Sequence, residues 1–338
     1  CGHKLLKWKF QIDLISKVVE LYCAPACSLS TKKVRIKMDI NFFKTTKILD
    51  GGMGQELLAR GMEPKGTLWS ANALIEEKYH DLILNIHNDF IKSGADVIVT
   101  TTFTTRRKRL RENGIEDQFK FLNQKACEIA QKAKLNNPHI KIAGGLPPQD
   151  LTYEEDKRSE KEITKDHLEL AEILNPSVDF FYFDVWSSIK EIRCGIEAIK
   201  KFNKPYLVGV HISEGNSLPS GEKISEINSI ITENCLGVIL ACVSPENYEN
   251  NLDEIQKLKV PFGFKLNGFI TTKPTGGYTS QYKENDGSNP NSFLGQRKDL
   301  DPEKISIFAK KFKENGATIL GGCCETRPSH IEAIKNII

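Results

Sequence analysis

Eight short apolar segments recur along this chain, and stretches with helical periodicity separate them. Each segment is rich in β-branched or aromatic residues and nearly all apolar before its last positions, which is typical of a strand covered on both faces. Such strands alternating with helices indicate a parallel sheet with crossover helices. The expected strands are residues 47–50, 96–101, 141–146, 178–184, 205–212, 236–242, 261–267 and 317–323. Eight units in 338 residues favour an α/β fold with a single (β/α)8 TIM barrel over a doubly wound sheet.

The segments between the expected strands carry helix signals. Asp301 and Pro302 open one segment as N-cap and first helical residue, and Gly316 closes it. Ser244 and Pro245 open another segment in the same way. A dinucleotide-binding sheet would instead place a glycine-rich phosphate turn after the first strand. The sequence there is LDGGMGQEL, and its glycine spacing does not fit that turn.

The first 45 residues differ from the rest of the chain. The chain opens with Cys1, its first methionine is Met38, and the regular pattern begins soon afterwards. Charged residues interrupt the apolar stretch LLKWKFQIDLISKVVELY, which therefore does not fit a secretory signal. We predict an N-terminal extension over 1–45, outside the domain, and a barrel over 46–338. An amphipathic helix that docks on the barrel or a partner is the competing interpretation, and whether 1–37 belong to the native protein stays open.

Composition and charge indicate a small-molecule partner. The formal net charge is only +3, and no basic stripe is interleaved with aromatic residues, which argues against a nucleic-acid or membrane surface. No apolar run approaches the roughly 20 residues of a transmembrane helix. We therefore expect a soluble, cytoplasmic protein that binds neither nucleic acid nor membrane. The oligomeric state does not follow from the sequence.

Several residues with reactive or polar side chains stand at the ends of the expected strands. Active sites of barrels lie at the mouth formed by the carboxyl ends of the strands, so these positions are the informative ones. They include Asp50, Thr101, Asp184, His211, Cys242, Asn267 and the adjacent Cys323 and Cys324. The chain has nine cysteines, and this odd number argues against a disulfide scaffold.

Three of the thiols are expected to meet, Cys242 from the sixth strand and Cys323 and Cys324 from the eighth. Successive side chains of a strand point to opposite faces, so adjacent cysteines can share one metal only where the backbone leaves the strand, and Gly321 and Gly322 permit that bend. Three thiolates with an open fourth position are typical of catalytic zinc, which would keep a substrate thiol deprotonated. Buried core cysteines and a redox-active vicinal disulfide remain alternatives at this point.

Four segments resemble those of a known family: ILDGGMGQELLARG, TLWSANAL, GVILACVSPEN and ATILGGCCETRPSHI. They are similar to the homocysteine S-methyltransferase family, which includes betaine-homocysteine methyltransferases and the homocysteine module of cobalamin-dependent methionine synthase. The resemblance covers about 46–338. It implies zinc held by Cys242, Cys323 and Cys324, and a homocysteine thiolate that attacks a methyl group on a sulfonium or quaternary ammonium donor, giving methionine. A sulfonium donor would leave as a neutral thioether and an ammonium donor as a neutral amine, so no side chain is expected to donate a proton.

The resemblance also implies where homocysteine binds. The expected contacts are Asp50, Gly51, Gly52, Thr101, Asp184 and Asn267. Asp184 stands where relatives commonly have a glutamate for the amino group of homocysteine, and it is shorter by one methylene. Relatives often have asparagine at the positions of Thr101 and Ala241 and a tyrosine at the position of Lys265. These departures concern substrate orientation and donor choice more than zinc.

The sequence does not identify the methyl donor, although two features bear on it. An aromatic box for the donor cation could be formed from Phe103, Tyr153 or Trp186, and packing at the rim is the alternative for each. The irregular segment 271–300 fits a functional lid or a variable surface loop. The alternative functions are a zinc methyltransferase acting on another thiol or selenol, and a non-catalytic thiol-rich zinc-binding protein.

Overall fold

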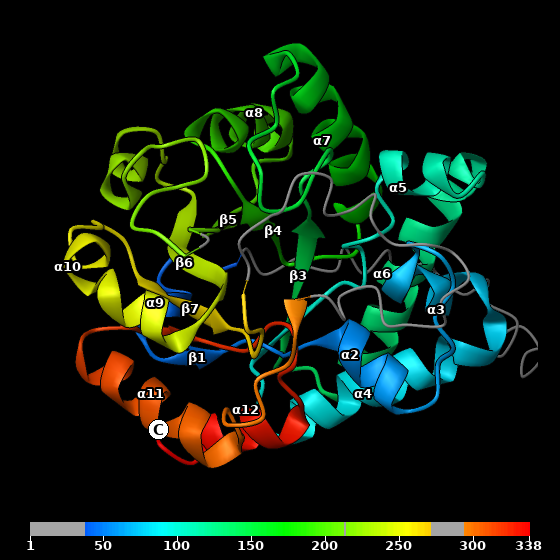
Figure 1. Cartoon of the computed structure of the whole chain (residues 1–338). Helices are drawn as coiled ribbons and strands as arrows, with labels where there is room; N and C mark the ends of the chain where they lie inside the picture. The colour runs from blue at the N-terminus through cyan, green and yellow to red at the C-terminus, as the bar shows by residue number, and fades with distance from the viewer. Residues whose placement is uncertain (1–37, 213, 272–293) are drawn as a thin grey trace, which may run out of the picture. The chain divides into compact units, whose positions relative to one another are not determined.

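The computed structural model describes residues 38–212, 214–271 and 294–338. Eight parallel strands pair in the order β1-β8-β7-β6-β5-β4-β3-β2, and a bridge between Leu49 and Val97 joins the two ends of this series. The strands are β1 Lys47–Ile48, β2 Val97–Val99, β3 Lys141–Leu146, β4 Phe180–Trp186, β5 Tyr206–Val210, β6 Cys235–Val243, β7 Phe262–Leu266 and β8 Ile319–Leu320. The sheet closes on itself with helices around it, which confirms the predicted (β/α)8 TIM barrel (Figure 1).

The α-helices follow the strands along the chain and pack on the outside of the barrel (Figure 1). They are α2 Met53–Ala59, α3 Asn72–Ile75, α4 His80–Lys92, α5 Arg107–Glu112, α6 Phe119–Asn136, α7 Glu160–Leu174, α8 Ile189–Ile199, α9 Pro245–Asn250, α10 Leu252–Ile255, α11 Pro302–Glu314 and α12 Pro328–Lys335. The 3-10 helices are η1 Phe42–Lys44, η2 Trp69–Ala71, η3 Glu77–Tyr79, η4 Glu116–Gln118, η5 Lys200–Phe202 and η6 Ile224–Ser229. Between β5 and β6, the described residues form η6 in place of an α-helix.

Side-chain caps start several of these helices where the sequence predicts them. Asp301 accepts a hydrogen bond from the backbone N–H of Lys304 at 2.8 Å, ahead of the proline that opens α11. Ser244 caps α9 in the same way at 3.2 Å. Such caps satisfy backbone donors that the first helical turn leaves unpaired. The Ser244 cap fixes the point at which the chain leaves β6, directly beside the mouth of the barrel.

The interior of the barrel is filled by one cluster of apolar side chains. The buried members are Met38, Phe43, Leu49, Val97, Ala143, Phe180, Tyr182, Leu207, Leu236, Ile239 and Ile319. The ring of Phe43 lies 5.9 Å from that of Phe180, centroid to centroid. The end of the predicted extension over 1–45 therefore packs with the barrel, whereas residues 1–37 lie outside the described residues.

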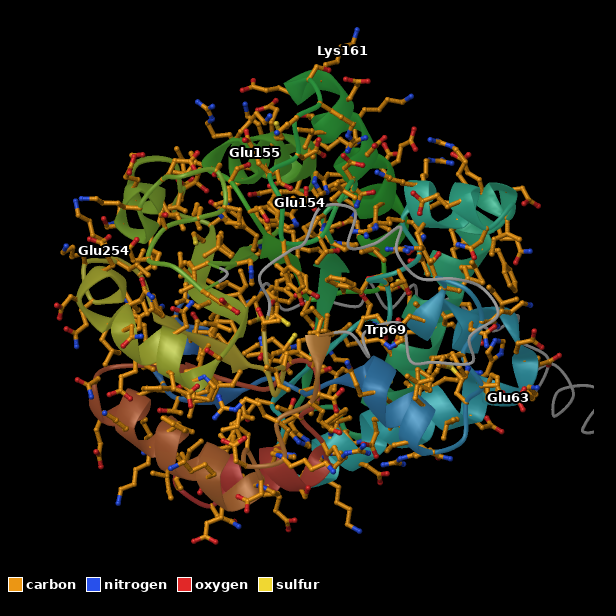
Figure 2. The ribbon with its side chains drawn as sticks, viewed as in Figure 1. Glu63, Trp69, Glu154, Glu155, Lys161 and Glu254 are labelled. Atoms are coloured by element: carbon orange, nitrogen blue, oxygen red, sulfur yellow. The ribbon has the colours of Figure 1, made fainter. Side chains whose placement is uncertain are left out.

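Charged side chains lie at the outer edge of the molecule (Figure 2). Figure 2 shows Lys161 and Glu254 at the edge of the molecule, whereas Trp69 lies nearer the centre of the view. In the parts of the chain that the structure describes, no helix is both long and apolar enough to cross a membrane. Most of the predicted lid or variable loop at 271–300 lies outside the described residues.

Candidate metal centre and active-site pocket

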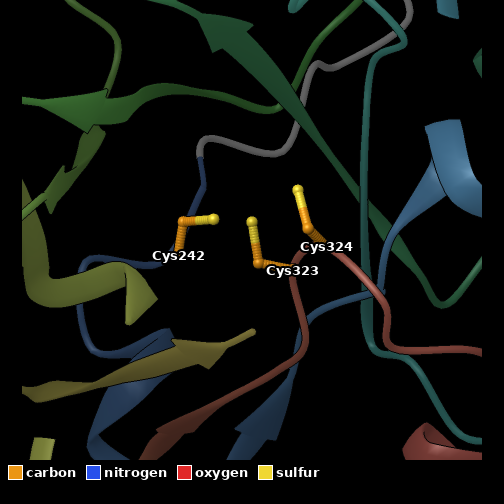
Figure 3. A group of neighbouring side chains, drawn as sticks. All are labelled: Cys242, Cys323 and Cys324. Atoms are coloured by element: carbon orange, nitrogen blue, oxygen red, sulfur yellow. The ribbon is translucent and has the colours of Figure 1, made fainter. Parts of the chain in front are cut away.

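Three cysteine side chains meet at the mouth of the barrel. Cys242 lies at the end of β6, and Cys323 and Cys324 follow β8. Their three sulfur atoms lie within 4.8 Å of one another, and Figure 3 shows them close together. Cys235, at the other end of β6, is outside this group, and its thiol faces the carbonyl of Gly237. In the described part of the chain, this is the one group of three or more side chains placed to hold a metal ion.

A bulge in β6 turns Cys242 toward the other two thiols. Ala241 pairs with Lys265 and Val243 pairs with Leu266, so Cys242 is the extra residue between two regular pairs. Its φ is 56°, in the left-handed region that non-glycine residues rarely adopt. Bulges of this kind re-aim a side chain and are frequent beside active sites. The local backbone strain at Cys242 is therefore tied to its place in the cluster.

A tight turn lets the adjacent cysteines face the same centre. The carbonyl of Cys323 accepts hydrogen bonds from the backbone N–H of Thr326 at 3.2 Å and from its hydroxyl at 2.6 Å. Glu325 adopts a φ of 62° within this turn. The chain thus leaves the strand before Cys324. Adjacent cysteines can share one metal only where the backbone leaves the strand in this way.

The glycines before the pair provide space rather than an unusual backbone angle. Neither Gly321 nor Gly322 has a positive φ. A Cβ at Gly322 would lie 2.1 Å from the Thr326 hydroxyl, and one at Gly321 would lie 2.9 Å from the side chain of Leu49. The sequence suggests that the backbone freedom of these glycines permits the bend. The structure shows instead that glycine is needed because neighbouring atoms leave no room for a side chain.

We expect Gly322→Ala to destabilise the barrel and loosen the cysteine turn. The added methyl group overlaps Thr326, and overpacking of this kind costs about 1–3 kcal/mol of unfolding free energy. Gly215→Ala is the matched control, because its Cβ would meet no atom nearer than 3.8 Å. Urea unfolding of both variants measures the difference. Equal midpoints for the two variants would contradict the packing role of Gly322.

Hydrogen bonds decide which thiol ionises first. Burial opposes a charge on Cys242, but hydrogen bonds from Cys323, Cys324 and Tyr153 outweigh it and hold the pKa of Cys242 well below its usual value. The pKa of Cys324 lies well above its usual value, because of its hydrogen bonds to Cys242 and Cys323 and its burial. The contacts within the cluster therefore favour a thiolate on Cys242 over one on Cys324. Three sulfur ligands suit a soft divalent metal.

Two side chains support Cys242 from behind. The Tyr153 hydroxyl lies 3.0 Å from the Cys242 sulfur. The amide nitrogen of Asn267 donates to the Cys242 carbonyl and lies 3.7 Å from its sulfur, while the Asn267 oxygen accepts from the N–H of Phe269. Arg106 in turn holds the loop before Tyr153, by hydrogen bonds to the Pro148 carbonyl and the Thr152 hydroxyl. Asn267 thus supports a cysteine and is not among the residues that line the pocket.

We expect Tyr153→Phe to weaken metal retention without disturbing the fold. The phenol is the hydroxyl donor to the Cys242 sulfur, and losing a partner outside the ligand set costs roughly tenfold or more in metal affinity. Tyr248→Phe is the matched control, because Tyr248 is buried and its hydroxyl has no hydrogen-bond partner among the described residues. Competition with a metal chelator measures the affinities. Identical curves for both variants would remove Tyr153 from the metal centre.

One pocket opens beside the thiols. Of the residues predicted to bind substrate, it is lined by Asp50, Gly51, Gly52, Thr101 and Asp184, together with all three cysteines of the cluster. The hydroxyl of Thr101 is buried and has no hydrogen-bond partner among the described residues. Five of the six predicted contacts therefore share a cavity with the cluster.

Asp50, Lys265 and Asp184 are charged residues of the pocket wall, which Arg106 and Arg109 also line. One oxygen of Asp50 lies 3.0 Å from the ammonium nitrogen of Lys265, and the other accepts from the N–H of Val99 at 2.8 Å. Asp184 lies where the register of β4 shifts, next to Val185 with a φ of 66°. Burial raises the pKa of Asp184 to about 7, although the charge of Lys265 acts against this rise.

The aromatic residues divide between the pocket and the core. Phe103 and Tyr153 line the pocket, as the aromatic-box prediction requires. Trp186 is fully buried, stacks on Phe183 at 4.1 Å between centroids, and lies outside the pocket. Trp69, which the sequence interpretation did not single out, takes its place beside Phe103, with centroids 6.3 Å apart.

Gly54 is a sequence feature that could have pointed to Trp69. A Cβ at Gly54 would lie 2.2 Å from the indole, so only glycine leaves room for this ring. His211, the remaining residue read from the strand ends, is fully buried, and its ring lies 4.3 Å from that of Tyr153. It therefore packs behind Tyr153.

Known proteins are similar to this chain over most of its length. The selenocysteine methyltransferase of Astragalus bisulcatus is 24% identical, over 86% of this chain and 92% of that protein. The homocysteine S-methyltransferase YbgG of Bacillus subtilis is also 24% identical, over 85% of this chain and 92% of that protein. The metallated form of the homocysteine methyltransferase MmuM from Escherichia coli superposes with a TM-score of 0.70 at 22% identity, covering 86% of this chain and 96% of that chain.

The family assignment rests on a family model. Residues 47–338 match a family model described as homocysteine S-methyltransferase. This range contains all eight strands and the three clustered cysteines. The chain therefore belongs to the homocysteine S-methyltransferase family.

Proposed function

We propose that this chain transfers a methyl group from a sulfonium or quaternary ammonium donor to the thiolate of homocysteine, forming methionine, with zinc held by Cys242, Cys323 and Cys324. The observation that carries the proposal is the three-thiol cluster beside a pocket that Asp184 and other charged residues line. In this proposal, residues 46–338 form the homocysteine-binding domain.

The donor set favours zinc over harder cations. Three soft sulfur ligands select zinc over magnesium or calcium, and three protein ligands leave one position open. When bound, zinc would keep the homocysteine sulfur deprotonated at neutral pH. The chain itself would orient the amino-acid end of homocysteine, whose ammonium needs acceptors and whose carboxylate needs donors.

Asp184 and Thr101 fit these two needs. The carboxylate of Asp184 takes part in no ion pair among the described residues, so it can accept the substrate ammonium. The buried hydroxyl of Thr101 can donate to the substrate carboxylate. Both side chains line the same pocket as the thiols, so a bound homocysteine would have its sulfur and its amino-acid group held at once.

The aromatic side of the pocket suits a cationic donor. Trp69 and Phe103 line it at an interplanar angle of 85°, and aromatic faces attract sulfonium and ammonium groups. In the reaction, a bond forms between the homocysteine sulfur and the methyl carbon. The bond from that carbon to the donor sulfur or nitrogen breaks, and its electron pair stays on the donor. The donor leaves uncharged at that atom, and the thiol proton is released when homocysteine binds.

A second substrate class is kept as an alternative, a different thiol or a selenol. One relative is named selenocysteine methyltransferase, and the shorter Asp184 changes the amino-acid end of the pocket. A selenol ionises more readily than a thiol and would use the same cluster.

The test is methyl transfer by the purified, zinc-loaded chain. Homocysteine or selenocysteine is combined with S-methylmethionine, glycine betaine, dimethylsulfoniopropionate or S-adenosylmethionine, and the products are measured by mass spectrometry. Methionine with at least one donor is the expected result. Preference for selenocysteine would favour the alternative, and zinc binding without product from any pair would indicate a non-catalytic zinc-binding protein.

A further inference from the structure

Lys265 places a positive charge inside the barrel, beside the metal centre. It lies on β7 opposite Ala241, is 5% exposed, and lines the same pocket as the thiols. Its ammonium nitrogen lies 3.0 Å from an oxygen of Asp50 and 5.8 Å from the centre of the Tyr182 ring. Lysine side chains are rarely buried without a negatively charged partner, and Lys265 has the carboxylate of Asp50 as its partner.

The ion pair between Lys265 and Asp50 distinguishes Asp50 from Asp184, the other acid of the pocket. Both oxygens of Asp50 already have donors, one being Lys265 and the other the N–H of Val99. Asp184 lies near the same ammonium but has no ion pair of its own among the described residues. The pair of Asp50 and Lys265 is therefore neutral as a unit, and Asp184 is the one acid of these three residues left for a ligand.

The charge of the zinc-loaded thiol cluster affects the free energy of any other charge in the pocket wall. Three thiolates and one divalent metal sum to a net charge of −1, and a substrate thiolate adds another negative charge. Unit charges interact strongly at short range in a buried site, where water screens them poorly. A change of one charge at the position of Lys265 or Asp50 should therefore alter which substrates bind.

We infer that Lys265 is a specificity-determining residue. Its positive charge cancels the negative charge of Asp50, and the pocket therefore selects thiols with a zwitterionic amino-acid end over thiols with a net positive charge. This inference rests on the proposed function. Homocysteine carries one ammonium and one carboxylate at that end, whereas 3-mercaptopropylamine carries the ammonium alone. A neutral pair beside Asp184 matches the first ligand, and an uncompensated Asp50 would favour the second.

The experiment varies the charge of the pair in three steps. Lys265→Met makes it more negative by one charge, Asp50→Asn makes it more positive by one, and the double variant Asp50→Asn with Lys265→Met is neutral like the wild type. Calorimetry measures the dissociation constants of homocysteine and 3-mercaptopropylamine for each zinc-loaded protein, and the ratio of the two is the selectivity. Metal analysis and circular dichroism accompany each variant.

We expect the selectivity to follow the charge of the pair. Lys265→Met should shift it about tenfold toward 3-mercaptopropylamine, Asp50→Asn should shift it in the opposite direction, and the double variant should return to the wild-type value. Because the two single variants shift in opposite directions, either one that fails to fold leaves the other as a test.

The outcomes separate this inference from the proposed function. Thiol binding with unchanged selectivity in the folded single variants overturns the role of Lys265 alone. A double variant that keeps the selectivity of Lys265→Met overturns it as well, because side-chain identity rather than charge would then decide. A zinc-loaded wild type that binds neither thiol overturns the proposed function and this inference with it.

Discussion

Cys324→Ser is expected to abolish both zinc retention and methyl transfer. Cys324 is buried in the cluster, with its sulfur within 4.8 Å of the other two. A serine hydroxyl is a hard and weakly acidic ligand, so two thiolates would remain where zinc needs three. Without the metal, the substrate thiol stays largely protonated at neutral pH, and the reaction loses its nucleophile. Emission spectroscopy measures the bound zinc, and methionine production measures the activity.

The matched controls are cysteines that the same change should not affect. Cys127 on α6 and Cys194 on α8 are buried and do not belong to the cluster. Burial raises the pKa of Cys127 to about 12, so this thiol stays neutral and serves in packing. Their serine variants should retain zinc and activity. An active, zinc-free Cys324→Ser protein would rule out the zinc-thiolate mechanism. An inactive but zinc-replete Cys127→Ser protein would show that the site extends further.

The architecture could be predicted because it depends on patterns that are local in the sequence. Each buried parallel strand is a short apolar run, and β3 coincides with its predicted range, Lys141–Leu146. The first and last strands are shorter than predicted, ending at Ile48 and Leu320, because the chain bends there into the glycines and the cysteine turn. Apolar character marks burial, but it does not mark where strand pairing stops.

The thiol cluster could be predicted for a similar reason. Parallel strands end at the same mouth, so cysteines at the ends of neighbouring strands must come close, whatever the details of packing. The bulges that aim Cys242 and Asp184 could not be predicted, because they depend on register with neighbouring strands.

The supporting contacts escaped prediction because they join distant positions. Lys265 and Asp50 are 215 positions apart and meet only once the barrel has closed. Tyr153 contacts Cys242 across 89 positions. The sequence showed an unusual lysine and a tyrosine of uncertain role, and their partners follow only from the fold.

Asp184→Ala is expected to raise the homocysteine concentration needed for half-maximal rate by roughly 10- to 100-fold, the range of a lost hydrogen bond to a charged group. The variant removes the carboxylate that we assign to the substrate ammonium. Bound zinc should be unchanged, because Asp184 is not one of the clustered ligands. Asp184→Glu is the matched variant, since it keeps the charge with one more methylene and should lose much less.

A thiol without an amino group distinguishes this role from a general loss of structure. For 4-mercaptobutanoate, which is homocysteine without its ammonium, Asp184→Ala should bind at least as well as the wild type, because no ammonium needs an acceptor and a like charge has been removed. Equal losses for both thiols would mean that Asp184 shapes the pocket rather than holding the ammonium. Loss of zinc in Asp184→Ala would place this residue in the metal centre instead, and the assignment of the amino-acid end would have to move to another residue of the pocket wall.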